Sequence, residues 1–195
     1  NRLANFVSNA ANHITARLSH VIVCLTRDYV EHSPFLKSFQ PKIQSIYPPV
    51  VMEPATQADE ADFRQRLGLK PDERIIGMAA RLATEKGVEV LARALPQVIE
   101  KFPTARVLFV GPYQNVFGEE DYAASLQPLI DRLGKAWTFL GVISPVDMTA
   151  FFQTCEVTVL PSVNKTEAYG MVQVESMRCG TPVVASDLPG IRVPV

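Results

Sequence analysis

Two glutamates and two cationic side chains are the residues of this chain whose types and spacing best suit chemistry. Glu167 and Glu175 lie eight residues apart and bracket the junction between a polar loop and a predicted helix. Arg81 and Lys86 lie five residues apart in a second polar loop. A guanidinium can fork onto two phosphate oxygens and an ammonium supplies a compact charge, whereas carboxylates accept hydrogen bonds from hydroxyl groups. These four groups could together bind a ligand with phosphates and hydroxyls.

The loop that carries Glu167 lies between an apolar run at residues 157–160, which predicts a buried parallel strand, and a helix predicted from about Tyr169 to Cys179. A helix N-terminus after a strand and a loop binds anions through its free amides. Two like charges 4 Å apart near a protein surface repel by about 4 kcal/mol. Glu167 therefore lies beside a phosphate only with cations nearby, or serves neutral hydroxyls. The plainer alternative is an amphipathic helix with two solvated glutamates.

The second loop, residues 80–87, follows another predicted strand and leads into a helix. Arg81 and Lys86 could balance the charge of a diphosphate there and offset the repulsion from Glu167. A solvated turn with surface ion pairs is the alternative. No G-x-G-x-x-G motif follows the strand, which counts against a nicotinamide or flavin cofactor.

The elements that must position these loops alternate regularly after residue 75. Apolar runs at 75–79, 106–110, 138–140, 157–160 and 182–185 are separated by helical stretches near 87–102, 121–134, 145–155 and 169–179. This alternation predicts an α/β fold with a parallel sheet covered by helices on both faces. Ligands of such sheets bind outside the carboxyl ends of the strands, at the switch point. Gly111, just after the second strand, permits close approach of a ligand or simply makes a turn.

The first 50 residues form a separate succession of elements. A helix is predicted over residues 1–19, a strand over 21–25, a helical stretch over about 28–39 and a short strand over 43–46. The pair Pro48–Pro49 breaks regular structure and indicates a linker.

Composition narrows the class of protein. The 195 residues are 47% apolar and have a net charge of −1, which is typical of a globular protein and makes no case for nucleic acid as a partner. No apolar run approaches the roughly 20 residues that span a bilayer, and no secretory signal is seen. The three cysteines are expected to be reduced, buried packing residues, so a cytoplasmic location is expected.

The motif Glu167–Ala168–Tyr169–Gly170, with Glu175 at the Glu-x7-Glu spacing, resembles retaining, nucleotide-sugar-dependent glycosyltransferases of the GT-B fold, family 4 type. The loop Arg81-x4-Lys86–Gly87 also matches that family. The resemblance covers roughly residues 20–195. It implies a GT-B type, Rossmann-like domain.

The resemblance also implies roles for individual residues. Glu167 would contact hydroxyls of the donor sugar, Glu175 would hold the ribose hydroxyls, and Arg81 and Lys86 would stabilise the leaving diphosphate. Ala168 lies where relatives carry other small or apolar residues, which leaves the sugar open. Backbone groups would contact the base, the sugar and the phosphates at Val142, Ile143, Tyr169, Gly170, Met171 and Val172.

The implied activity is transfer of a sugar from a nucleotide diphosphate sugar (UDP- or GDP-sugar) to an unknown acceptor, a glycan, lipid or small molecule, with retention of configuration. No cofactor is expected, and no metal, since no Asp-x-Asp motif occurs. Residues 1–50 would be the tail of an acceptor-side domain with its linker. Residues 51–195 would be the donor-binding domain, truncated at its C-terminus, so that the fragment alone would transfer poorly.

Two other classes of function stay open at the level of sequence. One is another enzyme on the same fold, such as a sugar-nucleotide epimerase or a phosphorylase. The other is a non-catalytic nucleotide-sugar-binding module. Membrane association is left open as well.

Overall fold

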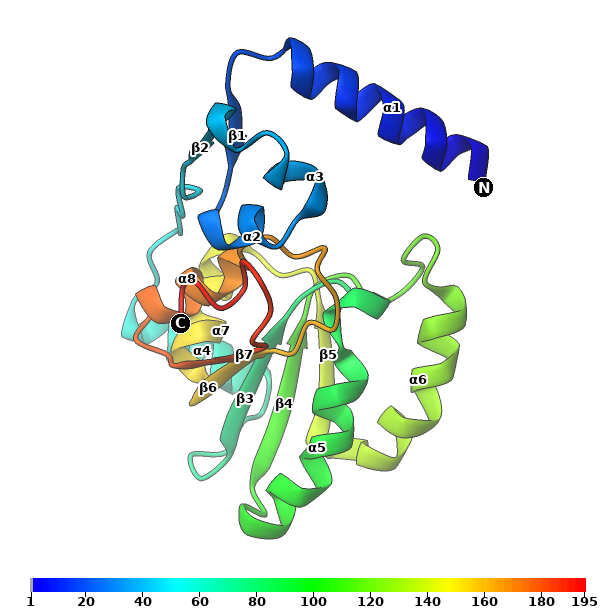
Figure 1. Cartoon of the computed structure of the whole chain (residues 1–195). Helices are drawn as coiled ribbons and strands as arrows, with labels where there is room; N and C mark the ends of the chain where they lie inside the picture. The colour runs from blue at the N-terminus through cyan, green and yellow to red at the C-terminus, as the bar shows by residue number, and fades with distance from the viewer. Residues whose placement is uncertain (1) are drawn as a thin grey trace. The chain divides into compact units, whose positions relative to one another are not determined.

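The computed structural model describes residues 2–195, which divide into a compact unit ending at Pro49 and a second from Val50 to Val195 (Figure 1). The first unit contains a short parallel pair of strands, β1 (Ile22–Cys24) and β2 (Ile43–Ser45). Helix α1 (Arg2–Leu18) precedes β1. The ammonium of Lys42 donates hydrogen bonds to the carbonyls of Ala16, Arg17 and Ser19, and so satisfies the C-terminal end of α1.

The helical stretch predicted over residues 28–39 is wrong in one respect, because it is broken in two. Helix α2 (Arg27–Glu31) is capped by Thr26, and α3 (Pro34–Lys37) is capped by Ser33. Pro34 lacks an N–H and is tolerated only in the first turn of a helix, so it begins a new helix rather than continuing the old one. A 3-10 turn, η1 (Gln40–Lys42), then leads into β2.

The second unit is a five-stranded sheet in which every strand pair is parallel. The strand order is β5-β4-β3-β6-β7. The chain leaves β3 toward β4 and β5, then crosses back to place β6 on the other side of β3, so the switch point lies between β3 and β6. The strands are β3 (Arg74–Ala79), β4 (Ala105–Val110), β5 (Trp137–Gly141), β6 (Val157–Leu160) and β7 (Val183–Ala185).

Helices cover both faces of this sheet, as Figure 1 shows. On one face Val107 and Phe109 of β4 pack with buried residues of α5 (Val88–Lys101) and α6 (Glu120–Leu133). On the other face Leu108 and Val110 pack with α4 (Gln57–Arg66) and α7 (Pro145–Thr154). Successive side chains of a strand point to opposite faces, so a strand buried on both sides is apolar throughout. The predicted α/β sheet is confirmed.

Capping explains where two helices begin. The hydroxyl of Ser144 accepts a hydrogen bond from the amide of Asp147, and Pro145 takes the first position of α7, as the sequence predicts. Helix α8 (Met171–Arg178) begins later than the predicted Tyr169. Gly170 has φ of 74°, a left-handed conformation that a helix cannot include. Of the three cysteines predicted to be buried, Cys155 is buried in the core, whereas Cys24 and Cys179 are only partly buried.

Candidate functional site

The loops that follow β3 and β6 meet at the switch point. The amide of Val163, after β6, donates a 3.0 Å hydrogen bond to the carbonyl of Glu85, after β3. This bond joins the loop of Arg81 and Lys86 to the loop of Glu167. The predicted charged residues are therefore presented at one edge of the sheet, between two strands that are neighbours in space.

Lys86 and Glu167 form an ion pair although they are 81 residues apart in sequence. Each side chain is only about one-fifth exposed, at 19% and 21%. The structure thus brings a cation of the first loop onto the carboxylate of the second, which supplies the nearby positive charge that Glu167 needs if a phosphate binds beside it.

Arg81 pairs within its own loop, with Glu85. Its side chain is half exposed, whereas that of Glu85 is mostly buried. The sequence left two interpretations of this loop, a pair of cations for a diphosphate and a solvated turn with surface ion pairs, and each fits one of the two cations. Arg81 forms the surface ion pair expected of a solvated turn, and Lys86 reaches across to the second loop.

Helix α8 begins four residues after Glu167, so its N-terminus follows the second loop directly. Its N-cap residue is Gly170, so no side chain caps the helix. The first amides of a helix have no partner inside it and carry a partial positive charge. The N–H groups at Met171 and Val172 are thus suited to an anion, whereas the side chain of Val172 packs into the core with α7.

A glutamine that the sequence reading missed fixes this end of α8. Gln173 is fully buried, and its side-chain amide donates to the carbonyls of Tyr169 (3.0 Å) and Ile191 (2.9 Å). It therefore ties the start of α8 to the segment after β7. In the sequence Gln173 is a polar residue between two valines. Its burial cannot be predicted from that pattern unless the buried face of the helix is already known.

Glu175 lies one turn further along α8 and is a half-buried carboxylate. Burial raises its pKa above the ordinary glutamate value. Among the residues that the structure describes, none donates a hydrogen bond to Glu175 or pairs with its charge. A desolvated carboxylate without a donor is costly, and hydroxyl groups of a ligand would supply the missing donors.

The remaining predicted contacts lie on loops after β4 and β5. The amide of Gly111 donates to the carbonyl of Gly141, and a Cβ at Gly111 would lie 2.1 Å from the carbonyl oxygen of Ala80. This glycine is thus required by the close approach of two loops. Val142 is exposed, and Ile143 packs partly into the core. Contacts of these residues, and of Ala168, with a ligand stay predictions.

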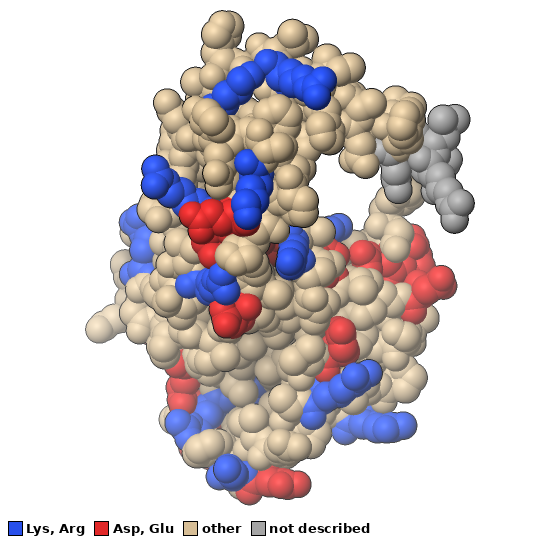
Figure 2. Space-filling view, viewed as in Figure 1, with Lys and Arg blue, Asp and Glu red and all other residues tan. Residues whose placement is uncertain are grey.

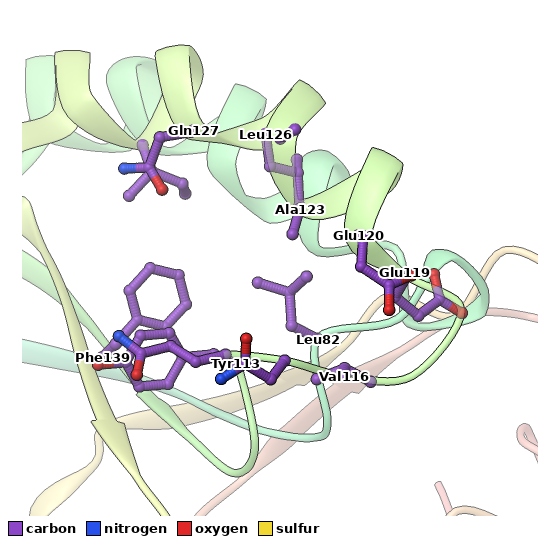
Figure 3. A pocket seen from close by; sticks show the side chains of 13 residues that line it. Leu82, Tyr113, Val116, Glu119, Glu120, Ala123, Leu126, Gln127 and Phe139 are labelled. Carbon is purple, nitrogen blue, oxygen red and sulfur yellow. The ribbon is translucent and has the colours of Figure 1, made fainter.

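A cavity of about 640 Å³ lies elsewhere, on the face covered by α5 and α6. Figure 3 shows Ala123, Leu126 and Gln127 of α6 facing Tyr113 and Phe139 across it, with Glu119 and Glu120 at one end. None of Arg81, Lys86, Glu167 and Glu175 lines this cavity. Volume alone therefore does not locate the charged site.

Charge and hydropathy add two observations. Figure 2 shows Lys and Arg side chains interspersed with Asp and Glu side chains on the visible face, so no extended field of one sign appears there. Within residues 2–195, no helix has the length and apolar character needed to cross a membrane.

Comparison with known proteins gives a consistent family. Residues 59–195 match the family model described as glycosyl transferases group 1. D-inositol 3-phosphate glycosyltransferase of Mycobacterium marinum is 32% identical over 157 residues, which are 79% of this chain and 32% of that protein. An uncharacterized glycosyltransferase of Methanocaldococcus jannaschii is 32% identical over 135 residues, which are 68% of this chain and 32% of that protein. The chain thus spans about one-third of the length of these curated relatives.

Solved structures give the same fold. HepE of Anabaena, in complex with UDP and glucose, matches with a TM-score of 0.81 and 26% identity over 94% of this chain and 49% of that one. HepE in complex with UDP-glucose matches with a TM-score of 0.80, again at 26% identity over 94% of this chain and 49% of that one. The likeness confirms the predicted GT-B type of α/β fold.

Proposed function

This chain belongs to the family glycosyl transferases group 1, and from that premise we propose that it binds a nucleotide diphosphate sugar at the switch point between β3 and β6, as the donor-binding part of a glycosyltransferase. The observation that carries the proposal is the meeting of Lys86 and Glu167. Two loops far apart in sequence there combine a cation for phosphate with a carboxylate for hydroxyls. The uncapped N-terminus of α8 adds amides for an anion.

Each group has a distinct role in this proposal. Arg81, Lys86 and the amides from Tyr169 to Val172 hold the diphosphate. Glu167 accepts hydrogen bonds from the sugar, and Glu175 accepts them from the ribose. Two unpaired polar groups, the ribose hydroxyls and the Glu175 carboxylate, would then satisfy each other. Ala168 would lie against the sugar, Gly111 would border the ligand, and Val142 and Ile143 would meet the base.

Lys86 can serve both Glu167 and a phosphate. An ammonium has three donors on a flexible stem, so one N–H can stay on the carboxylate while the others turn to phosphate oxygens. The bound diphosphate then gains a cation without leaving Glu167 uncompensated beside it. The ion pair is therefore compatible with ligand binding, and it holds Glu167 ready for the sugar.

The proposed reaction is transfer of the sugar to an acceptor with retention of anomeric configuration. Negative charge develops on the diphosphate as the glycosidic bond to the sugar breaks. Arg81, Lys86 and the start of α8 would stabilise that charge, and preorganised groups of this kind are usually the largest source of catalysis. A reaction without metal ion or cofactor is part of the proposal. The complexes of HepE with UDP and UDP-glucose support a uridine donor.

Calorimetric titration of the chain with UDP, GDP and ADP tests the proposal. We expect UDP to bind most tightly, and Arg81→Ala to weaken it about tenfold, since hydrogen bonds to charged groups contribute about 1.5–3 kcal/mol. Arg93→Ala, which removes an exposed arginine of α5, is the matched control and should change the affinity less than about twofold. Absence of binding at millimolar UDP, or equal losses in both variants, would contradict the proposal.

A further inference from the structure

The hydrogen-bond ladder between β3 and β4 continues past the ends of the strands. The amide of Ala80 donates to the carbonyl of Val110 (2.9 Å), and the amide of Leu82 donates to the carbonyl of Pro112 (2.7 Å). The next alternate amide, that of Thr84, donates to a carboxylate oxygen of Glu119 (2.9 Å). A side chain thus replaces the backbone carbonyl as the third acceptor in the series.

Glu119 holds Thr84 by two hydrogen bonds to one oxygen. Besides the amide, the hydroxyl of Thr84 donates to the same carboxylate oxygen at 2.7 Å. Thr84 begins the 3-10 turn η2 (Thr84–Lys86), and Lys86 ends it. The two bonds therefore attach the loop after β4 to the turn that presents Lys86 to Glu167.

The carboxylate of Glu119 is not used by its own helix. Glu119 is the N-cap residue of α6, yet its side chain makes no capping hydrogen bond. Ser, Thr, Asp and Asn are the residues that cap well at this position. Its hydrogen bonds to Thr84 lower the pKa of Glu119, and the charge of Arg81 lowers it further, so the carboxylate stays ionised at neutral pH.

Packing fixes the chain just before the turn, because Leu82 and Ala83 are both buried and Leu82 belongs to the core on this face of the sheet. Leu82 and Glu119 both line the cavity of about 640 Å³ beneath α6 (Figure 3). A side chain that borders a cavity lacks van der Waals partners on that side. Thr84 itself is exposed, so beyond Ala83 the turn is held by hydrogen bonds, those of Thr84 to Glu119 and that of Val163 to the carbonyl of Glu85.

We propose that Glu119 is a positioning residue for the phosphate-binding cations, which fixes the turn Thr84–Lys86 through its two hydrogen bonds to Thr84. It touches no part of the ligand and acts through Thr84 on Lys86. Its consequence for the ligand rests on the proposed function of the switch-point site. The hydrogen bonds between Glu119 and Thr84 do not depend on that proposed function.

Two variants of Glu119 separate the acceptor oxygen from the charge. Glu119→Gln keeps an oxygen that can accept both bonds from Thr84 but removes the charge near Arg81. Glu119→Ala removes both, and Glu120→Ala is the matched control for loss of a neighbouring carboxylate. Amide hydrogen exchange at Thr84, followed by NMR in the whole chain, reports the bond directly. Titration with UDP reports its consequence.

We expect the Thr84 amide to exchange about tenfold faster in Glu119→Ala, because its hydrogen-bond acceptor is removed, and less than about twofold faster in Glu119→Gln and Glu120→Ala. UDP affinity should fall about tenfold in Glu119→Ala and should be restored in Glu119→Gln. Thr84→Val keeps the amide and loses the hydroxyl. Its amide exchange rate and its UDP affinity should lie between those of the unaltered chain and those of Glu119→Ala.

The outcomes distinguish this inference from the proposed function. If Glu119→Gln behaves like Glu119→Ala, the charge matters rather than the hydrogen bonds, and the inference is overturned. If Thr84 exchanges faster while UDP affinity is unchanged, Glu119 holds the turn but does not position the cations, which also overturns it. If the unaltered chain binds no UDP, the proposed function fails, and exchange at Thr84 and Lys86 still decides whether Glu119 fixes the turn.

Discussion

Lys86 and Glu167 are the pair of residues on which the site depends, because each changes what the other can do. Their opposite charges meet in a position that is about four-fifths buried. The carboxylate would repel a diphosphate if it were alone, and the ammonium would be freer to bind phosphate if the carboxylate were absent. In the proposed site, the pair would therefore lower the affinity for the nucleotide somewhat and in return hold a carboxylate in place for the sugar.

Glu167→Gln should separate these two effects. We expect the variant to bind UDP more tightly, by up to about fivefold, because it loses the repulsion and frees Lys86. It should also lose any preference for UDP-glucose over UDP. Titrations with both ligands give the measurement, with Glu100→Gln, an exposed glutamate of α5, as the control. Weaker UDP binding, of the kind expected for Lys86→Ala, would speak against this account of Glu167.

Glu175 should show opposite effects on stability and binding. The pKa of the Glu175 carboxyl is higher in the folded chain than in the unfolded chain. The group therefore stabilises the fold at a pH below its unfolded-state pKa, and this stabilisation is lost as the pH rises through its folded-state pKa. At neutral pH the ionised, partly desolvated carboxylate destabilises the folded state. We therefore expect Glu175→Gln to have a higher Tm at pH 7 but to bind UDP about five- to tenfold more weakly.

The pH dependence of binding checks the same residue. UDP affinity of the unaltered chain should fall as the pH is lowered until Glu175 is protonated, at a higher pH than for an ordinary glutamate. Glu175→Gln should lack this component. A variant that loses both stability and affinity would indicate a structural role for the carboxylate instead.

At the scale of elements, helix α8 depends on glycines at both ends, and they differ in what surrounds them. Gly170 and Gly180 have φ of 74° and 82°. A Cβ at Gly170 would lie 2.5 Å from the Nε2 of Gln173 and 2.7 Å from a methyl of Leu160, whereas one at Gly180 would meet nothing within 4 Å. Both positions carry the left-handed penalty, and only Gly170 adds a clash.

Gly180→Ala should therefore lower the free energy of unfolding by about 1–2 kcal/mol. Gly170→Ala should lower it by at least about 1 kcal/mol more, because the buried Gln173 must shift. Only the change at Gly170 should also weaken UDP binding, since it moves the amides of Met171 and Val172. Urea denaturation and titration measure the two effects. Equal losses in both variants would mean that the start of α8 is not constrained as described.

The elements show what local sequence determines. Regular apolar runs predict each strand of the second unit to within about two residues. The central strands β3 and β4 are apolar because they are buried on both faces, whereas the edge strand β7 is apolar although Val184 is exposed. The cap at Ser144 and Pro145 was predicted because its chemistry is local. The start of α8 was not, since the conformation of Gly170 depends on Gln173 and Leu160, which pack around it only after folding. The break at Pro34 is local as well, because a proline is tolerated only in the first turn of a helix.

At the scale of the whole molecule, the order of the strands determines which loops and side chains meet at the proposed site. The sequence predicts a parallel sheet and a ligand at its switch point, but the strand order places that point between β3 and β6. The contact of Lys86 with Glu167 and the bonds of Glu119 to Thr84 follow from this order. No local pattern encodes such pairs, which are 81 and 35 residues apart. The cavity beneath α6 likewise depends on how a helix settles on the sheet.

The proposed site lies wholly within the second unit, which leads to a prediction for residues 50–195 alone. All five strands of the sheet and both core clusters belong to this unit. We expect the shortened chain to fold, as judged by circular dichroism, and to bind UDP within about twofold of the whole chain. A folded fragment with affinity reduced tenfold or more would show that residues before Pro49 contribute to binding.

The central claim is that a nucleotide sugar binds at the switch point, and NMR of the isotopically labelled chain during titration with UDP tests it most directly. We predict that the amide signals of residues 81–87 and 168–175 shift first and most. Signals around the cavity, at Tyr113, Val116 and Phe139, should change little. Shifts that gather at the cavity and spare Lys86 and Glu175 would contradict the account, because UDP would then bind beneath α6 instead.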